Sequence, residues 1–185
     1  MAGSTLTQDS PASGDLPPSV EIRKLAPADA AAWRALRLEA LQMHPAAFAE
    51  SFEEAAQRDL AWFRDRMPTP GAANAIFGVF DHGQLVGCAG FAVQTLAHLR
   101  HKGVMWGVYL RPGLRGRGIG AALVGRVIRH ARQQVAVLQA AVAVDNIAAA
   151  ALYRRAGFKS YGREPRALRV DSRDIDEELL AIDLN

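Results

Sequence analysis

The 185-residue sequence has a single cysteine, Cys88, which excludes an internal disulfide and a metal site built from several cysteines. Cys88 lies inside the apolar run Leu85–Phe91, and this position favours a buried structural thiol over a reactive nucleophile. None of the five histidines has a partner at the H-x-x-x-H spacing, so we expect no zinc or other metal site. The scarcity of cysteine is typical of a reducing, cytoplasmic setting.

The sequence also lacks any run of about 18 apolar residues, the length that a membrane-spanning helix needs, so we expect no membrane partner. Residues 1–19 contain no Lys or Arg and no apolar block, which makes them a poor signal peptide. They are rich in Ser, Pro, Gly and Thr, a composition that predicts a disordered N-terminal tail. The remainder, residues 20–185, is predicted to form one domain, because half of the chain is apolar and 22% is charged.

Charge of one sign is only slightly in excess, with 22 Lys and Arg against 19 Asp and Glu and a formal net charge of +3. Such a modest excess suits a small polyanionic ligand better than a long nucleic acid, which usually requires a broad basic face. Much of the basic charge lies in Arg111, Arg115, Arg117, Arg126, Arg129 and Arg132. We expect the last three to be solvated charges on a helix, whereas Arg115 and Arg117 lie among glycines.

Hydrophobic periodicity and turn residues predict one α/β domain with the element order β-α-α-β-β-β-α-β-α-β-β. Helices are expected over residues 29–44, 51–66, 118–133 and 146–156, the second of them beginning at the capping box Ser51–Glu54. Strands are expected over residues 20–25, 75–80, 85–93, 104–110 and 135–144, with two final strands around a polar turn at 171–174. The continuous apolar run 135–144 is typical of a strand buried on both faces.

The segment Arg115-Gly-Arg-Gly-Ile-Gly120 lies between a predicted strand and a predicted helix. Its glycines allow positive φ and close backbone approach, so that successive N–H groups can turn toward one anion. The first turn of the helix adds unpaired N–H groups and the positive end of the helix dipole. With Arg115 and Arg117 beside it, the segment predicts a phosphate-binding site rather than a simple tight turn.

Two nucleotide-binding motifs fit this loop poorly. The Lys-Ser/Thr pair of a P-loop is absent. Gly116–Ala121 does match the dinucleotide fingerprint G-x-G-x-x-G/A, but that motif also needs an acidic residue about 20 positions further on. The corresponding region, 136–140, is uncharged. An NAD-type enzyme is therefore disfavoured, although it remains an alternative.

The sequence on both sides of the glycines resembles the GNAT N-acetyltransferase superfamily. An apolar strand leads into R/Q-x-x-G-x-G/A, which is met by Arg115, Gly118 and Gly120. A second family block follows after one helix and one apolar strand, namely Asn146-x-x-Ala-x-x-Leu-Tyr153-x-x-x-Gly-Phe158. The resemblance spans roughly residues 20–184 and implies a GNAT-like fold, a mixed central sheet of about six to seven strands with helices on both faces.

The resemblance further implies an acyltransferase that uses acetyl-CoA as its co-substrate and acetylates a primary amine by direct attack in a ternary complex. In this family a bulge splays the strand before the loop from its neighbour, and its exposed main chain pairs with the pantetheine arm. By position this strand segment is Val108, Tyr109 and Leu110. Asn146 would hydrogen-bond the pantetheine region, and it is also suited to cap the next helix. The pyrophosphate is expected on the loop residues Arg115, Gly116, Arg117, Gly118, Ile119 and Gly120.

Tyr153 is the catalytic candidate that the resemblance implies. The family's tyrosine at this position lies near the sulfur and protonates the departing thiolate, and a nearby O–H suits that chemistry. The alternative for Tyr153 is a helix tyrosine packed in the core. A non-catalytic acyl-CoA-binding module on the same fold is the corresponding alternative function, which an intact tyrosine argues against.

The base that deprotonates the amine is left open, because the strand before the loop contains no carboxylate, where many relatives have one. The candidates are Glu50, Glu53 and Glu54 at the start of the second helix, His101, and a water chain. The three glutamates are also favoured simply as first-turn charges. Trp106 and the first two helices are expected to shape the pocket of a small-molecule or protein amine acceptor. The final strands would support a homodimer, as they often do in this family.

Overall fold

The computed structural model describes residues 16–69 and 71–185, so most of the predicted N-terminal tail lies outside the described residues. Of the part of that tail that is described, Leu16 packs against the core, and the carbonyl of Pro17 accepts the Val20 N–H at 2.8 Å. In the described part of the chain, no helix is long and apolar enough to cross a membrane.

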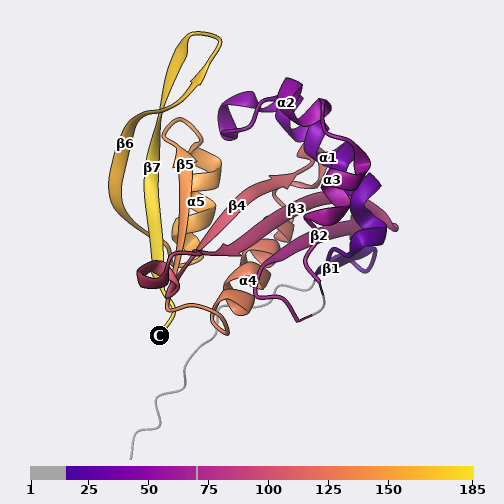
Figure 1. The fold of residues 1–185 in the computed structure, drawn as a ribbon, viewed down its shortest axis with the longest axis horizontal. Coiled ribbons are helices and arrows are strands. Elements are labelled where there is room, and N and C mark those ends of the chain that lie inside the picture. The colour runs from indigo at the N-terminus through magenta and orange to yellow at the C-terminus, as the bar shows by residue number, and fades with distance from the viewer. Residues whose placement is uncertain (1–15, 70) are drawn as a thin grey trace, which may run out of the picture.

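The centre of the fold is a seven-stranded mixed sheet in the order β1-β2-β3-β4-β5-β7-β6 (Figure 1). Its strands are β1 (Val20–Lys24), β2 (Ala75–Asp81), β3 (Gln84–Val93), β4 (Lys102–Leu110), β5 (Val137–Ala143), β6 (Lys159–Val170) and β7 (Arg173–Asp183). All neighbouring pairs are antiparallel except β4 and β5, which are parallel. The predicted strand order along the chain and the size of the sheet are both confirmed.

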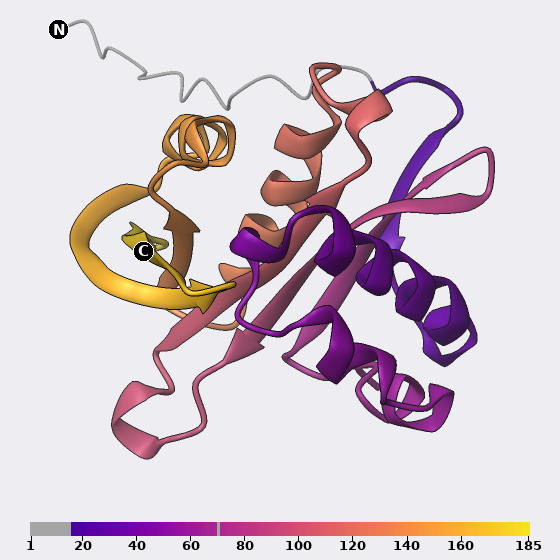
Figure 2. The same cartoon turned by 90° about the horizontal axis from the view of Figure 1, so that it is seen from above.

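Helices cover both faces of the sheet, as predicted (Figure 2). They are α1 (Ala30–Met43), α2 (Phe52–Ala56), α3 (Leu60–Asp65), α4 (Ile119–Ala131) and α5 (Ile147–Arg155). One buried cluster joins α1 and α3 to one face, and a second joins α4 and α5 to the other. Short 3-10 segments η1 (Pro27–Asp29), η2 (Pro45–Ala47), η3 (Ala97–Leu99) and η4 (Pro112–Leu114) connect these elements.

The hydrophobic pattern of α4 explains why this helix forms and where it packs. Ile119, Leu123, Val127 and Ala131 recur every four residues and are completely buried. Strand β2 is covered on both sides in the same way, since Phe77 and Val79 face the cluster with α4 while Ile76 and Phe80 face the cluster with α1.

The single helix predicted over residues 51–66 is wrong, because the segment forms two short helices. The capping box is present: Ser51 Oγ accepts the Glu54 N–H at 3.1 Å, and Glu54 Oε2 accepts the Ser51 N–H at 2.9 Å. Helix α2 nevertheless stops at Ala56. Asp59 then caps α3 by accepting the Trp62 N–H at 2.8 Å. The guanidinium of Arg34 on α1 donates hydrogen bonds to the carbonyls of residues 56 and 58, at 3.1 and 3.2 Å. These bonds stabilise the break between the two helices.

Strand β5 is not buried on both faces, contrary to the prediction from its apolar run. Leu138, Ala140 and Val142 pack into the cluster with α4 and α5, whereas Gln139 is half-buried and Ala141 is exposed. One face of β5 therefore remains open, on the side where η2 approaches it. The polar turn after β6 is also tighter than expected, since only Asp171 and Ser172 form it, both with left-handed φ.

Strands β4 and β5 separate along their length. They pair only from Lys102 to Val104 against Val137 to Gln139, and beyond this point no strand of the described residues pairs with β4 on its β5 side. A bulge at Gly107 (φ +62°) shifts the register between β3 and β4, so that Trp106 pairs with Gly90 and Tyr109 with Cys88. The splay and the bulge that the family resemblance implied are thus both present.

Candidate active site

A cleft of about 840 Å³ opens where β4 and β5 part. Its walls come from four segments: the end of α1 with η2, the end of β4, the glycine-rich loop with the first turns of α4, and the end of β5 with one side of α5 along its length. Most of the predicted site residues line it, namely Val108, Tyr109, Leu110, Arg115, Gly116, Gly118, Gly120 and Asn146. Arg117 is exposed and Ile119 is fully buried, and neither side chain lines the cleft.

The glycine-rich loop presents a row of unpaired amides to this cleft. Gly116 (φ +75°) and Gly118 (φ +78°) adopt left-handed conformations, and a Cβ at either position would meet nothing within 4 Å. The first backbone hydrogen bond of α4 runs from the Ala122 N–H to the Gly118 carbonyl at 3.0 Å. Within the described residues, the amides from Gly116 to Ala121 therefore donate to no protein acceptor. This is the arrangement that binds a phosphate at a helix N-terminus.

Arg115 links the loop to the end of α1, which also lines the cleft. Its Nε donates to the Leu110 carbonyl at 2.9 Å, and its Nη2 lies 3.1 Å from Nε2 of His44, the residue that ends α1. A guanidinium can only donate, so Nε2 of His44 must be the acceptor and the imidazole must be neutral. Burial and the charge of Arg115 both lower the pKa of His44, which keeps it in that form.

Arg111 and Tyr109 are held by Glu39 of α1. Both oxygens of the Glu39 carboxylate accept from Arg111, whose Nη2 lies 2.7 Å from Oε2, and Oε1 also accepts the Tyr109 hydroxyl at 3.0 Å. The hydrogen bond from Arg111 is the main reason why the pKa of Glu39 is lowered. Burial and the Glu39 carboxylate raise the pKa of Tyr109 to about 12. No sequence motif pointed to Glu39, which lies about 70 positions from both partners.

Asn146 and Tyr153 occupy different environments on α5. Asn146 Oδ1 accepts the Ala149 N–H at 3.2 Å, so the residue caps the helix while also lining the cleft. Tyr153 is only 6% exposed and packs against Phe158, with the ring centroids 5.8 Å apart. Its neighbours Ala149 and Leu152 line the cleft, but Tyr153 does not. Burial raises the pKa of Tyr153, which keeps the phenol protonated.

None of the four side chains considered as a general base lines the cleft. Glu50 is held in ion pairs with Arg37, at 3.0 Å, and with Arg58. Glu54 closes the capping box and Glu53 is exposed beside it. His101 precedes β4, about 30 Å of extended strand away from Leu110.

Trp106, which we expected to shape the acceptor pocket, is partly buried at the β4 bulge. Its ring lies 6.4 Å from that of Trp33 on α1. It does not line the cleft, so any contact with an acceptor would lie further along the splay, toward the point where β4 and β5 still pair.

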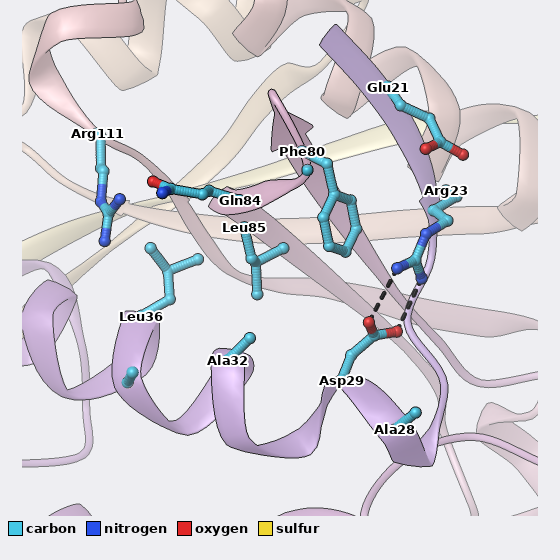
Figure 3. A pocket seen from close by; sticks show the side chains of 12 residues that line it. Glu21, Arg23, Ala28, Asp29, Ala32, Leu36, Phe80, Gln84, Leu85 and Arg111 are labelled. Atoms are coloured by element: carbon cyan, nitrogen blue, oxygen red, sulfur yellow. Dashed lines mark hydrogen bonds and ion pairs between the residues drawn. The ribbon is translucent and has the colours of Figure 1, made fainter. Parts of the chain in front are cut away.

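A second cavity of about 520 Å³ lies between α1 and the edge formed by β1, β2 and β3 (Figure 3). Arg23 forms two hydrogen bonds with Asp29, at 2.8 and 2.9 Å, and stacks on the Phe80 ring. Arg111 lines the other end, where Glu39 binds it. Since the charges of these arginines are already matched by carboxylates of the chain, this cavity is a weaker candidate for chemistry than the first one.

The sequence and the fold resemble those of known proteins. The sequence profile described as Acetyltransferase (GNAT) family matches residues 33–158. A mycothiol acetyltransferase from Streptomyces scabiei is 36% identical over 85% of this chain and 48% of its own length, so the chain spans about half the length of that relative. An L-methionine sulfoximine/L-methionine sulfone acetyltransferase from Pseudomonas aeruginosa is 29% identical over 68% of this chain and 72% of its own length.

Among solved structures, a Salmonella typhimurium protein described as an acetyltransferase, in complex with acetyl-CoA, superimposes with a TM-score of 0.76. The alignment covers 90% of this chain and 95% of that one, at 24% sequence identity. This likeness establishes the fold.

Proposed function

The chain belongs to the acetyltransferase (GNAT) family, and we propose from this membership that it transfers the acetyl group of acetyl-CoA to a primary amine. The observation that carries the proposal is the row of free amides from Gly116 to Ala121 beside the unpaired edge of β4. The amides suit a pyrophosphate, and the free edge suits an extended arm that pairs with main-chain groups as another strand would.

The residues of the cleft divide the binding of acetyl-CoA between them. The loop amides and Arg115 would hold the pyrophosphate. The main chain of Val108 and Leu110 would pair with the pantetheine arm, because β5 has left this edge of β4 free. Asn146, already at the cleft wall, would contact the arm from the opposite side. The size of the cleft, about 840 Å³, is within the range of ordinary cofactor sites.

The chemical step needs an acid for the leaving thiolate as well as a free amine. Nitrogen attacks the thioester carbonyl, a C–N bond forms, and the C–S bond breaks to release a thiolate that takes up a proton, while the nitrogen gives up one proton to water. Tyr153 is the proposed donor, since its raised pKa keeps the proton at neutral pH and its helix flanks the cleft. Tyr153 itself does not line the cleft, so its hydroxyl would have to turn toward the sulfur past its neighbours Ala149 and Leu152, which do.

The acceptor is proposed to be a small molecule or a protein that carries a primary amine. The relatives include enzymes named for mycothiol and for L-methionine sulfoximine, so the family context does not single out one acceptor. A panel of amines with acetyl-CoA, followed by detection of the released thiol, would identify the class. Binding of acetyl-CoA without turnover on any amine would instead favour a non-catalytic acyl-CoA-binding module.

The assignment is tested first by ligand specificity. Acetyl-CoA and CoA are expected to raise the melting temperature, because a ligand that binds only the folded state stabilises it, whereas NAD is expected to leave it unchanged. A shift with NAD alone would overturn the acetyltransferase assignment.

The role of Tyr153 is tested by Tyr153→Phe, which removes one buried oxygen and keeps the ring. Turnover is expected to fall by about 10²- to 10⁴-fold, the usual contribution of an acid catalyst, with the affinity for acetyl-CoA nearly unchanged. Tyr161→Phe is the matched control, because Tyr161 is an exposed tyrosine on β6. Unaltered turnover in Tyr153→Phe would remove Tyr153 from the mechanism.

A further inference from the structure

The end of α1 and the glycine-rich loop both line the cleft, and Arg115 joins them. Its Nη2 is 3.1 Å from Nε2 of His44, and its Nε is 2.9 Å from the Leu110 carbonyl. His44 itself lines the cleft and is half-buried. Two neutral acceptors on two different elements therefore fix the direction of one long, flexible cation.

We propose that His44 is a positioning residue for the pyrophosphate of acetyl-CoA, holding the Arg115 guanidinium beside the free loop amides. The inference rests on the proposed function of the cleft. Arg115 has five N–H donors, and Leu110 and His44 use two of them, which leaves three for phosphate oxygens. An arginine side chain that is free to rotate loses much rotamer entropy when a ligand binds to it. Because His44 already restricts Arg115 in the unliganded protein, less entropy is lost on binding.

The neighbouring arginine shows why His44 suits this task better than a carboxylate would. Arg111 is neutralised by Glu39, so its charge is not available to a ligand. Arg115 has neutral partners and keeps its full positive charge at the cleft. A carboxylate in place of His44 would fix the guanidinium equally well but would also repel the pyrophosphate.

The surroundings of His44 keep its imidazole neutral. The ring of Tyr109 on β4 lies 6.0 Å away, with its hydroxyl bound to Glu39, and Arg115 approaches from the loop. Asp145 and Arg155 line the far wall of the cleft, and η2, which follows His44, contains no titratable residue. Protonated His44 would lose the hydrogen bond with Arg115.

The test compares two substitutions and two ligands, with dissociation constants measured by calorimetric titration in the absence of an acceptor. His44→Ala removes the acceptor, whereas His44→Gln keeps one, because the Gln amide oxygen lies close to the position of Nε2. Acetyl-CoA contains the pyrophosphate, and S-acetylpantetheine carries the same thioester arm without it. Gln42→Ala, an exposed position near the end of the same helix, is the matched control.

For His44→Ala we expect the Kd of acetyl-CoA to rise by about 3- to 12-fold, the range that corresponds to the cost of ordering one long, rotamer-rich side chain on binding. The Kd for His44→Gln and for Gln42→Ala should stay within about two-fold of the wild type, and the Kd of S-acetylpantetheine should be the same in all four proteins. In an Arg115→Ala background, His44→Ala should have no further effect on the Kd of acetyl-CoA, because His44 acts only through Arg115.

Two outcomes would overturn the inference. An unchanged Kd of acetyl-CoA in His44→Ala excludes a positioning role. Equal losses for acetyl-CoA and S-acetylpantetheine mean that His44 only shapes the wall of the cleft. Failure of the wild-type protein to bind acetyl-CoA is a different result, because it contradicts the proposed function itself.

Discussion

Gly118 is the residue at which the backbone of the glycine-rich loop, the proposed phosphate site, can be tested most directly. It precedes α4, with φ +78°, and a Cβ there would contact nothing within 4 Å. In Gly118→Ala the side chain therefore causes no clash, and the whole effect comes from the left-handed conformation, which costs an L-residue about 1–2 kcal/mol.

This cost can appear in either of two places. If the free loop keeps its shape, the free energy of unfolding falls by about 1–2 kcal/mol and the Kd of acetyl-CoA is unchanged. If the free loop relaxes to negative φ, the free energy of unfolding is preserved and the amides turn away. The ligand must then restore the original conformation, and its Kd rises by about 5- to 30-fold. The two losses together should amount to about 1–2 kcal/mol in either case.

Urea unfolding gives the first quantity and calorimetric titration of acetyl-CoA gives the second. Gly125→Ala is the matched control, because Gly125 lies inside α4 with open space around it and no positive φ. That substitution should stabilise the protein by about 0.5–1 kcal/mol without changing the Kd. If Gly118→Ala behaves like Gly125→Ala in both assays, the left-handed cradle is not the conformation of the loop in solution.

Three further predictions concern the support of the cleft. Gly90→Ala would place a Cβ inside the indole of Trp106, so we expect a loss of about 1–3 kcal/mol in urea unfolding; unchanged stability would show that the indole moves freely. Burial raises the pKa of Cys88 to about 11, so its thiol should not react with a disulfide reagent at pH 8 until the protein is unfolded, and rapid reaction of the folded protein would contradict this. Glu39→Gln should lower stability at pH 7 by about 1–2 kcal/mol. Pairing with Arg111 lowers the pKa of Glu39 below its ordinary value of 4.5, so this stabilisation is present above that value and is lost as pH falls through the lower pKa of the folded protein. The gap to the wild type should therefore narrow only below about pH 4.5, and a gap that persists in strong acid would refute the linkage.

Elements whose bounds are set by a local sequence pattern were predicted accurately, whereas elements whose bounds depend on contacts with distant residues were not. The stripe from Ile119 to Ala131 is a local signal, and α4 begins and ends within two residues of its predicted bounds. The break between α2 and α3 depends instead on Arg34, more than twenty positions upstream, which binds the carbonyls of residues 56 and 58. The prediction that β5 is buried on both faces was wrong for a related reason, since nothing within its apolar run shows that one face of the strand stays open.

In the candidate site, too, residues that act locally could be predicted from the sequence, whereas residues that act through distant partners could not. The glycines of the loop act through their own backbone, so the sequence alone predicts a phosphate cradle, and the structure places free amides there. Glu39 and His44 act through partners 70 to 72 positions away, and no local pattern marks them. Their roles follow only once α1 lies beside the end of β4.

The three arginines around the loop have different roles, although the sequence places them within seven residues of one another. Arg111 is bound by a carboxylate, Arg117 is exposed and does not line the cleft, and Arg115 has two neutral partners and lines it. At the proposed site, a ligand with two phosphates would therefore meet one oriented guanidinium and a row of amides, not three equivalent charges. Replacing Arg115 should consequently weaken binding of acetyl-CoA more than replacing Arg117, and substitution of Arg111 should act mainly through the position of Glu39 and the stability of the fold.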